Sequence, residues 1–361
     1  MKNVLIDIGH PAHVHLFRNL YRELTSCGYR VTVTIKDVAI IKMLLNKYGI
    51  PFQVLGKKSD SIAGKFFDQL RFGLRLWRIV IRNNIRIGIG TSIGIAHISR
   101  VSRMVSFVCD DDDSEVQPLM ARFGHPFADY IVSPDVLSFE RKGKNAIVYP
   151  GYHELAYLHP SHFTPDRSVL AEHGIGDNEI FFVMRFNAFK AHHDVGVNGL
   201  SLQQKRELIE ILKPFGKIII TTEKDIDEEF RQFQIKVSPE KAHSLLAFAH
   251  IFLGDSQTMT SEAAMLGVPS LRCNSLVKRI SYLNEQENRY GLTKGYLPEE
   301  FDLLKAELLN WINTPNLKSD WRIKRDAMLK DKINVARFQF QLLTQFASEG
   351  KVDIDQIIAN S

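Results

Sequence analysis

Short apolar runs alternate with helical repeats along the first half of the chain. Residues 4–8 form an apolar run that ends at Gly9, and Phe17, Leu20 and Leu24 then recur at helical spacing as far as Gly28. The β-rich run 29–35 follows, so the pattern predicts a β-α-β start. The alternation continues through helices at 40–47 and 66–83 and through strands at 52–55, 85–90, 104–109 and 130–132. This order indicates a parallel sheet, which the strand at 130–132 would complete.

A change in composition at residues 149–165 indicates a domain boundary, because prolines and a glycine stand there among aromatic and histidine residues. The alternation then restarts, with strands at 180–184, 217–221, 251–253 and 270–272 and helices at 202–212, 242–249 and 259–266. The charged segment 320–348 is helical, and we expect it to pack back towards the first domain. The predicted parts are therefore two Rossmann-like α/β domains, 1–160 and 161–325, and a helical tail, 326–361.

Composition narrows the class of protein. The 361 residues are 45% hydrophobic and 24% charged, which excludes disorder, collagen and coiled coil. The start of the chain lacks the features of a signal peptide, and no uncharged run approaches the roughly 18 residues of a membrane span. We therefore expect a cytoplasmic protein, with peripheral contact at the inner face of the membrane left open. Cys27, Cys109 and Cys273 are far apart and form no CxxC pair, so neither a disulfide framework nor a zinc knuckle is indicated. A net charge of +5 without a Lys/Arg block argues against nucleic acid as a partner.

The most specific motif is the run 254–269, GDSQTMTSEAAMLGVP. It follows an apolar strand and opens a helix, so free backbone N–H groups and the positive end of the helix dipole suit a diphosphate. Glu262 lies about two turns inside that helix and could reach a ribose. The alternative is an ordinary capped helix, with Asp255 or Ser256 as the N-cap.

The pattern D-S-x(5)-E-A-x-x-L-G-x-P in this run resembles the nucleotide-binding signature of the GT-B superfamily of glycosyltransferases and non-hydrolysing UDP-N-acetylglucosamine 2-epimerases. Together with GHPAHVHLF near the start and FVMRFNAFKAHHD at the start of the second half, it makes the whole chain similar to a GT-B-like domain-of-unknown-function family found in surface polysaccharide loci. The resemblance implies two domains whose parallel sheets face a cleft. It also implies a ribose contact by Glu262 and a UDP diphosphate held by the loop Asp255, Ser256, Gln257, Thr258 and Met259. Gln257 and Thr258 stand where the epimerases usually have two glycines.

Three histidines follow the first predicted strand, at the carboxyl end where open α/β sheets place ligands. His10 is the best-placed base or substrate contact, and it resembles the GH after the first strand of the undecaprenyl-muropeptide N-acetylglucosaminyltransferase. His13 and His15 are candidates for the acceptor site or cleft. Zinc ligation is an alternative, since HPAH is similar to the HP-D-D of zinc sugar deacetylases, although Ala12 and His13 replace its carboxylates. A capping and packing cluster is the other alternative.

Asp110 to Asp113 form a carboxylate cluster directly after the predicted strand 104–109. Carboxylates so close together raise one another's pKa, which suits proton transfer, and we select Asp111, Asp112 and Asp113 as catalytic candidates. The epimerase resemblance also puts catalytic acids after this strand. A DxD metal site of the other glycosyltransferase fold and a solvated turn are the alternatives.

Further candidates follow the strands of the second half. The segment with Arg185 and Asn187 resembles the HR-x-E-N segment of the epimerases, with Met184 in place of its histidine. We assign Arg185, Asn187 and His243 to nucleotide-sugar binding, and His192, His193 and Glu223 to the acceptor site or cleft.

Arginines recur at i, i+4, i+7 and i+11 in the helix predicted at 66–83, which aligns Arg71, Arg75, Arg78 and Arg82 in one stripe flanked by Phe66, Phe67, Phe72, Leu76 and Trp77. The stripe is either a solvated helix face or a docking surface for an anionic membrane.

The resemblance and the candidate residues together predict glycosyl transfer from a nucleotide sugar, UDP-linked, in surface polysaccharide or glycoconjugate biosynthesis. A hydroxyl of a glycan or lipid-linked acceptor would attack the anomeric carbon, with His10 or an acid among Asp111–Asp113 as base. No cofactor or metal is expected, since the nucleotide sugar is a co-substrate. A 2-epimerase-like isomerase and a non-catalytic nucleotide-sugar-binding protein remain as alternatives.

Overall fold

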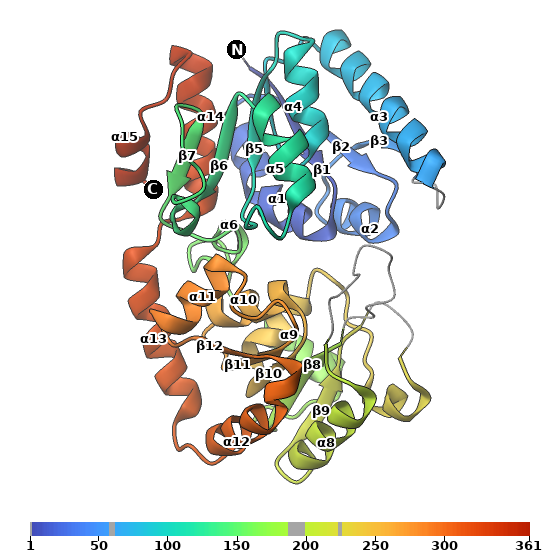
Figure 1. Ribbon diagram of the computed structural model, residues 1–361, viewed down its shortest axis with the longest axis vertical. Coiled ribbons are helices and arrows are strands. Elements are labelled where there is room, and N and C mark those ends of the chain that lie inside the picture. Colours follow the sequence, from blue (N-terminus) through green and yellow to red (C-terminus); the bar gives the residue numbers. More distant parts are fainter. Residues whose placement is uncertain (1, 58–61, 187–198, 223–225) are drawn as a thin grey trace. The chain divides into compact units, whose positions relative to one another are not determined.

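A computed structural model of the chain describes residues 2–57, 62–186, 199–222 and 226–361. The chain divides into two compact units (Figure 1). The first comprises Met1–His162 together with Lys332–Ser361, and the second comprises Phe163–Asp331. Each unit is built around its own parallel sheet.

The first unit contains a seven-stranded sheet in the order β3-β2-β1-β4-β5-β6-β7. Its strands are β1 (Asn3–Ile8), β2 (Arg30–Lys36), β3 (Gln53–Gly56), β4 (Ile87–Gly90), β5 (Val105–Cys109), β6 (Tyr130–Pro134) and β7 (Ala146–Tyr149). All neighbouring strands are parallel, so their carboxyl ends share one edge. The expectation that the strand at 130–132 completes this sheet is wrong, because β7 adds a further edge strand. β7 has only four residues next to Pro150 and Gly151, whose turn-forming character hid it in the sequence.

The helices of this unit are α1 (Pro11–Ser26), α2 (Ala39–Lys47), α3 (Ile62–Arg82), α4 (Ile93–Arg100), α5 (Pro118–Phe123), α6 (Leu155–Leu158), α14 (Val335–Glu349) and α15 (Ile354–Ala359), with the 3₁₀ turns η1 (His125–Phe127) and η2 (Asp135–Leu137). α1 packs against α2, α6 and α14, whereas α3 packs against α4 (Figure 1). The α1 face that is buried carries Val14, Phe17, Leu20 and Leu24 at helical spacing. Within the described ranges, no helix combines the length and the apolar character needed to cross a bilayer.

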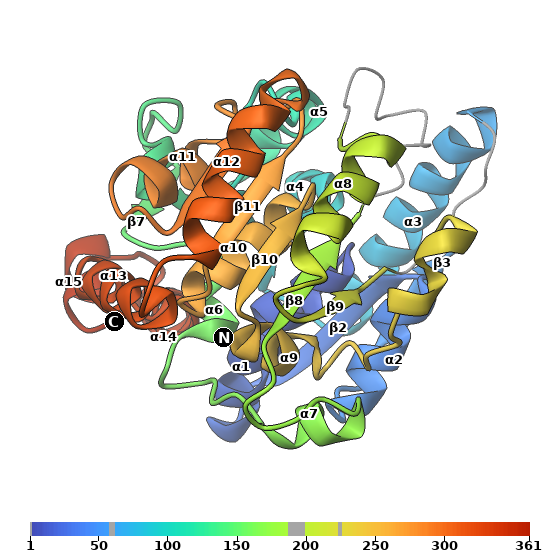
Figure 2. The ribbon, with the colours of Figure 1, turned by 90° about the horizontal axis from the view of Figure 1, so that it is seen from below.

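The second unit contains a five-stranded parallel sheet in the order β12-β11-β10-β8-β9. The strands are β8 (Phe181–Arg185), β9 (Lys217–Ile220), β10 (Ile251–Gly254), β11 (Ser270–Cys273) and β12 (Thr293–Tyr296). α8 (Leu202–Leu212) and α12 (Phe301–Ile312) pack together over one face of the sheet (Figure 2). α10 (Gln257–Met265) packs between α9 (Ala242–Phe248) and α11 (Ser281–Asn288). The remaining helical elements are α7 (Ser168–Glu172), α13 (Leu317–Asp331), η3 (Glu228–Phe233) and η4 (Pro298–Glu300).

The charged segment near the end of the chain is not one helix. α13 ends at Asp331 in the second unit, and α14 begins after Asn334, whose side chain accepts a hydrogen bond from the Arg337 N–H and caps the helix. The Ile333 N–H donates to the Pro150 carbonyl at 2.8 Å, which holds the start of this last segment against the first unit.

Candidate functional site

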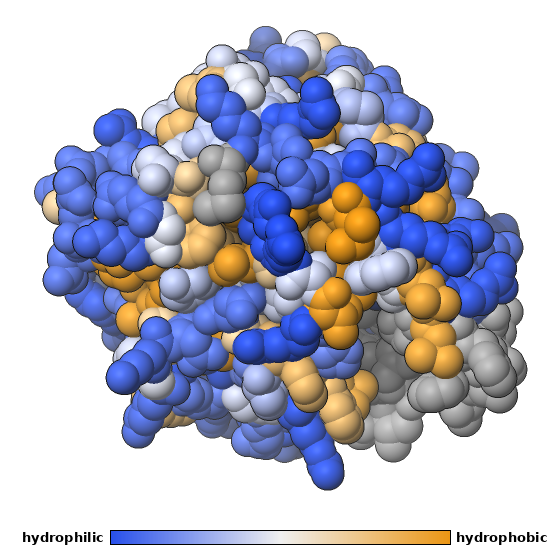
Figure 3. All heavy atoms as spheres, turned by 90° about the horizontal axis from the view of Figure 1, so that it is seen from above, coloured by the Kyte–Doolittle hydropathy of each residue, from blue (hydrophilic) through white to orange (hydrophobic). Residues whose placement is uncertain are grey.

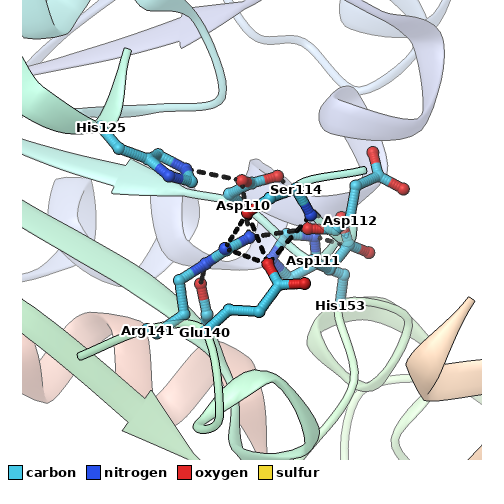
Figure 4. A network of polar contacts seen from close by, with 9 residues as sticks. Asp110, Asp111, Asp112, Ser114, His125, Glu140, Arg141 and His153 are labelled. Atoms are coloured by element: carbon cyan, nitrogen blue, oxygen red, sulfur yellow. Dashed lines mark hydrogen bonds and ion pairs between the residues drawn. The ribbon is translucent and has the colours of Figure 1, made fainter. Parts of the chain in front are cut away.

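The acidic cluster lies where β5 leaves the sheet of the first unit (Figure 4). β5 is buried up to Cys109, and the Asp110 N–H still donates to the Val132 carbonyl of β6 at 3.0 Å. Beyond that bond the chain turns over the carboxyl edge of the sheet. Carboxylate oxygens of Asp110, Asp111 and Asp112 there lie within 4.8 Å of one another.

Asp110 is held by two cationic or protonatable partners. Arg141 approaches it through Nη2 at 3.0 Å, and His125 through Nε2 at 2.7 Å. The same buried guanidinium donates to the Asp112 carbonyl at 2.6 Å and pairs with Glu140 at 3.0 Å (Figure 4). Arg141 therefore anchors the loop that carries the cluster, and Asp110 serves as part of that anchor.

Asp111 forms an ion pair with His153, with Oδ2 and Nδ1 3.1 Å apart. Burial acts to raise the pKa of Asp111, but His153 and His13 nearby bring that pKa below its ordinary value. Burial likewise acts to lower the pKa of His153, and Asp111 overcomes it and raises that pKa. Asp111 thus stays ionised, and His153 holds a proton more strongly than an ordinary histidine.

Asp112 has the opposite character. Burial and the negative charges of Asp111 and Asp110 raise its pKa from 3.8 to about 7. Two adjacent carboxyl groups with pKa values pushed in opposite directions are the arrangement that assigns acid and base roles in enzymes. Asp112 can therefore accept or release a proton near neutral pH while Asp111 remains charged.

Asp113 is buried but is not a member of the group of three. Its carbonyl accepts hydrogen bonds from the Val116 and Gln117 N–H groups, so it closes the turn that leads to α5. Within the described ranges, Asp110, Asp111 and Asp112 form the one group of His, Cys, Asp or Glu side chains spaced to hold a metal ion. Asp110 and Asp111 are already compensated by Arg141 and His153, which leaves little uncompensated charge for a cation.

The three histidines at the start of α1 separate. His13 is hydrogen-bonded to Thr91, with Nδ1 and Oγ1 2.6 Å apart, and burial, with His10 and His153 acting in the same direction, lowers its pKa to about 3. His10 caps α1, its Nδ1 accepting from the Ala12 N–H, and its ring lies 5.7 Å from that of His13. The His15 ring packs against those of Tyr48 and Tyr157 instead. The structure thus brings His13 to Asp111 and His153, keeps His10 beside it, and directs His15 elsewhere, since i and i+2 do not share a helix face.

In the second unit, the predicted loop and helix surround the start of α10. Ser256 is the N-cap, and its Oγ accepts from the Met259 N–H at 3.3 Å. Gln257, Thr258 and Met259 form the half-buried first turn. Asp255 is buried, and its backbone N–H and carbonyl are held by the Arg185 carbonyl and the Asn274 side chain. The first N–H groups of this helix lack intrahelical acceptors and face the loop.

Gly254 allows this loop to form beside β8. A Cβ atom there would stand 2.2 Å from the Arg185 carbonyl oxygen, so only glycine fits. Arg185, which pairs in register with Gly254, donates from Nη1 to the Thr221 carbonyl at 3.3 Å. Its guanidinium group lies at the carboxyl edge of the second sheet.

Glu262 and His243 form a buried pair. The His243 Nε2 lies 2.9 Å from the Glu262 Oε1, and both side chains are less than a tenth exposed. α9 supplies the histidine, whose ring meets Phe163 edge-on. The two residues were separate candidates in the sequence, and the structure joins them in one hydrogen-bonded pair. Asn187, His192, His193 and Glu223 lie outside the described residues.

His153, His125 and Arg141 were not among the residues predicted from the sequence. His153 follows β7, so recognition of that strand would have selected it by the carboxyl-end argument used for His10. His125 and Arg141 carry no comparable signal, because their proximity to Asp110 arises only when β5, β6 and the following loops are assembled.

Two α/β units, each with a parallel sheet and with polar residues at its carboxyl edge, define a protein of the GT-B fold. Solved structures agree. A UDP-N-acetylglucosamine 2-epimerase aligns with a TM-score of 0.67 at 14% identity over 98% of this chain and 97% of its own. The spinosyn forosaminyltransferase SpnP aligns with a TM-score of 0.65 at 13% identity over 97% and 100%.

The family is more specific than the fold. Residues 2–290 match the family described as "Protein of unknown function (DUF354)", and the chain belongs to this family. The uncharacterized protein MJ0665 of Methanocaldococcus jannaschii is 24% identical over 289 residues, which cover 75% of this chain and 81% of that protein.

Proposed function

We propose that this protein is a nucleotide-sugar enzyme that transfers a glycosyl group from a UDP-linked donor to a hydroxyl of a glycan or lipid-linked acceptor. The main support is the raised pKa of Asp112, about 7, beside the ionised Asp111. A base with that pKa exists in useful amount at neutral pH and is strong enough to assist loss of a hydroxyl proton.

The second unit is the proposed donor site. The start of α10 offers N–H groups and the positive end of the helix dipole to a diphosphate, and Arg185 adds a guanidinium group. Glu262 would accept hydrogen bonds from the ribose hydroxyls, while His243 holds its carboxylate in one orientation at 2.9 Å. The choice of UDP is supported by the likeness to the UDP-N-acetylglucosamine 2-epimerase.

The reaction follows from these roles. Asp112 accepts the proton of the acceptor hydroxyl as its oxygen forms a bond to the anomeric carbon. The bond from that carbon to the diphosphate oxygen breaks, and its electron pair leaves with UDP. N–H groups and Arg185 stabilise the departing charge, so we propose no metal or other cofactor for this step. His10 and His13 would contact the acceptor, with His13 neutral because of its low pKa.

Epimerisation at C2 of the sugar is a second candidate, favoured by the opposite pKa shifts of Asp111 and Asp112. Inversion at C2 needs one group that removes the proton as a base and another that delivers a proton to the opposite face as an acid. In the resembling segment Met184 takes the place of the epimerase histidine, which favours transfer as the first choice.

One experiment separates the candidates. Purified protein is incubated with UDP-N-acetylglucosamine in deuterium oxide, with and without an extract of glycan and lipid-linked acceptors, and followed by NMR. UDP released only with acceptor supports transfer, whereas deuterium at C2 without acceptor supports epimerisation. The Asp112→Asn variant, which keeps the size of the side chain, should abolish either signal. Neither signal, in protein that binds UDP, would overturn both and leave a binding protein.

A further inference from the structure

The inner face of α3 is part of the core of the first unit. Phe72, Leu76 and Val80, spaced four residues apart, are buried and pack with Ile95, Val108 and other core residues. Asp68, four residues earlier, is buried on the same side. This row fixes the rotation of the helix about its axis, and therefore also what the helix presents outward.

The face opposite the core is apolar. Leu70, Leu74, Trp77 and Ile81 recur at i, i+4, i+7 and i+11, with 52%, 56%, 38% and 51% of their surface exposed. At 100° per residue this stripe is centred about 150° from the buried row. A surface helix of a globular protein ordinarily carries polar residues there. Four large apolar side chains in one outward row therefore indicate a site that contacts another apolar surface.

Arginines flank this row. Arg71, Arg75, Arg78 and Arg82 follow its members by one residue each, so they form a parallel stripe about 100° around the helix, and all four are exposed. Arg75 also donates from Nη1 to the Leu55 carbonyl at 2.6 Å, which ties its guanidinium group to β3. The described part of α3 holds one carboxylate, the buried Asp68, against these four guanidinium groups.

The apolar patch continues beyond α3. The Trp77 Nε1 donates to the Val101 carbonyl at 3.3 Å, and Val101, at the end of α4, is itself 65% exposed. Figure 3 shows the molecule from above the view of Figure 1. On that side, apolar side chains stand among strongly hydrophilic ones.

We propose that the outer face of α3 docks on an anionic lipid bilayer, with Leu70, Leu74, Trp77 and Ile81 entering the boundary between headgroups and acyl chains. The arginine stripe then binds lipid phosphates alongside. Charge complementarity selects this occupant, because a cationic stripe beside an apolar one matches an interface with anionic headgroups over an apolar interior. The helix lies in the interface and does not span it. This docking is independent of the proposed reaction and would bring a lipid-linked acceptor to the surface on which the enzyme rests.

Trp77 provides a local readout. Of the three tryptophans, Trp311 and Trp321 are buried, at 3% and 6% exposure, and belong to the second unit. Fluorescence changes on adding vesicles therefore report the environment of Trp77. The protein is titrated at low salt with phosphatidylcholine vesicles that do or do not contain phosphatidylglycerol. We expect a blue shift with the anionic vesicles, quenching by lipids brominated in the upper acyl chain, and co-sedimentation that weakens as salt is added.

Two variants separate charge from insertion. Replacing Arg71, Arg75, Arg78 and Arg82 by Gln should weaken vesicle affinity about fivefold for each arginine. The double variant Leu74→Ser and Ile81→Ser should abolish the quenching while some electrostatic association persists. The matched control replaces four exposed basic residues elsewhere in the first unit, Arg30, Lys142, Lys144 and Lys351, by Gln and should bind like wild type.

Three results would overturn the proposal. The first is that wild-type protein does not bind anionic vesicles at low salt. The second is that the arginine variant and its charge control lose binding equally. The third is a dimer, measured by sedimentation equilibrium, that is lost in the Leu74→Ser and Ile81→Ser variant while vesicles have no effect, because the face would then bind a second copy of the chain. UDP affinity measured in parallel keeps this test separate from that of the proposed function.

Discussion

Replacing Asp112 by asparagine removes a carboxyl group that the fold keeps difficult to ionise. Burial and the charges of Asp111 and Asp110 raise its pKa from 3.8 to about 7. Between about pH 4 and about pH 7 the folded protein therefore holds a proton at this position that the unfolded chain has lost. The free energy of unfolding falls as pH rises through this window and levels off above it, because the folded state must then also ionise the group.

The shift sets the size of the effect. A change from 3.8 to about 7 corresponds to about 4 kcal/mol at 1.36 kcal/mol per pKa unit. Asparagine has nearly the same shape and no charge, so we expect the variant to match wild type at about pH 4. At about pH 8 it should be more stable by up to about 4 kcal/mol. The same variant should lose roughly 10²–10⁴-fold in turnover, since it lacks the base.

Urea unfolding at several pH values between about 4 and 8 measures this difference. Glu349→Gln, which removes an exposed carboxylate at the end of α14, serves as the control and should run parallel to wild type. A variant whose stability differs from wild type by the same amount at every pH would refute the reasoning. So would an asparagine variant that is less stable than wild type at about pH 8.

The other predictions concern single contacts. Glu262→Ala should weaken UDP binding, measured by calorimetry, by roughly 1.5–3 kcal/mol, because ribose hydroxyls lose a charged acceptor; unchanged affinity would remove Glu262 from the donor site. Arg141→Ala should lower the free energy of unfolding by about 3–5 kcal/mol, because Asp110 stays buried without its cation, and a neutral result in urea unfolding would contradict the anchoring role. His10→Ala should reduce turnover strongly and leave UDP affinity nearly unchanged, whereas full activity would make His10 only a helix cap.

Local patterns in the sequence were enough to predict much of the fold. Alternating strands and helices predicted two α/β domains with parallel sheets. Buried parallel strands are short apolar runs, and the apolar positions of the helices that cover them repeat every 3.6 residues. Ser256 and the helix after it could also be predicted, since capping depends on residues a few positions apart. β7 could not be predicted, because a four-residue edge strand shows too short a hydrophobic pattern beside the turn-forming Pro150 and Gly151.

Contacts between distant segments were decided only by the tertiary structure. The arginine stripe of α3 was visible in the sequence, but Phe72, Leu76 and Trp77 appeared equivalent beside it. Packing buries the first two and leaves Trp77 outside, because only the assembled core determines which of the two apolar faces of this helix lies inward. The Asp111–His153 and Glu262–His243 pairs likewise join residues 42 and 19 positions apart. Sequence places each such residue at the end or face of its own element, whereas pairing and pKa depend on distance, burial and charge, which exist only once the elements have packed.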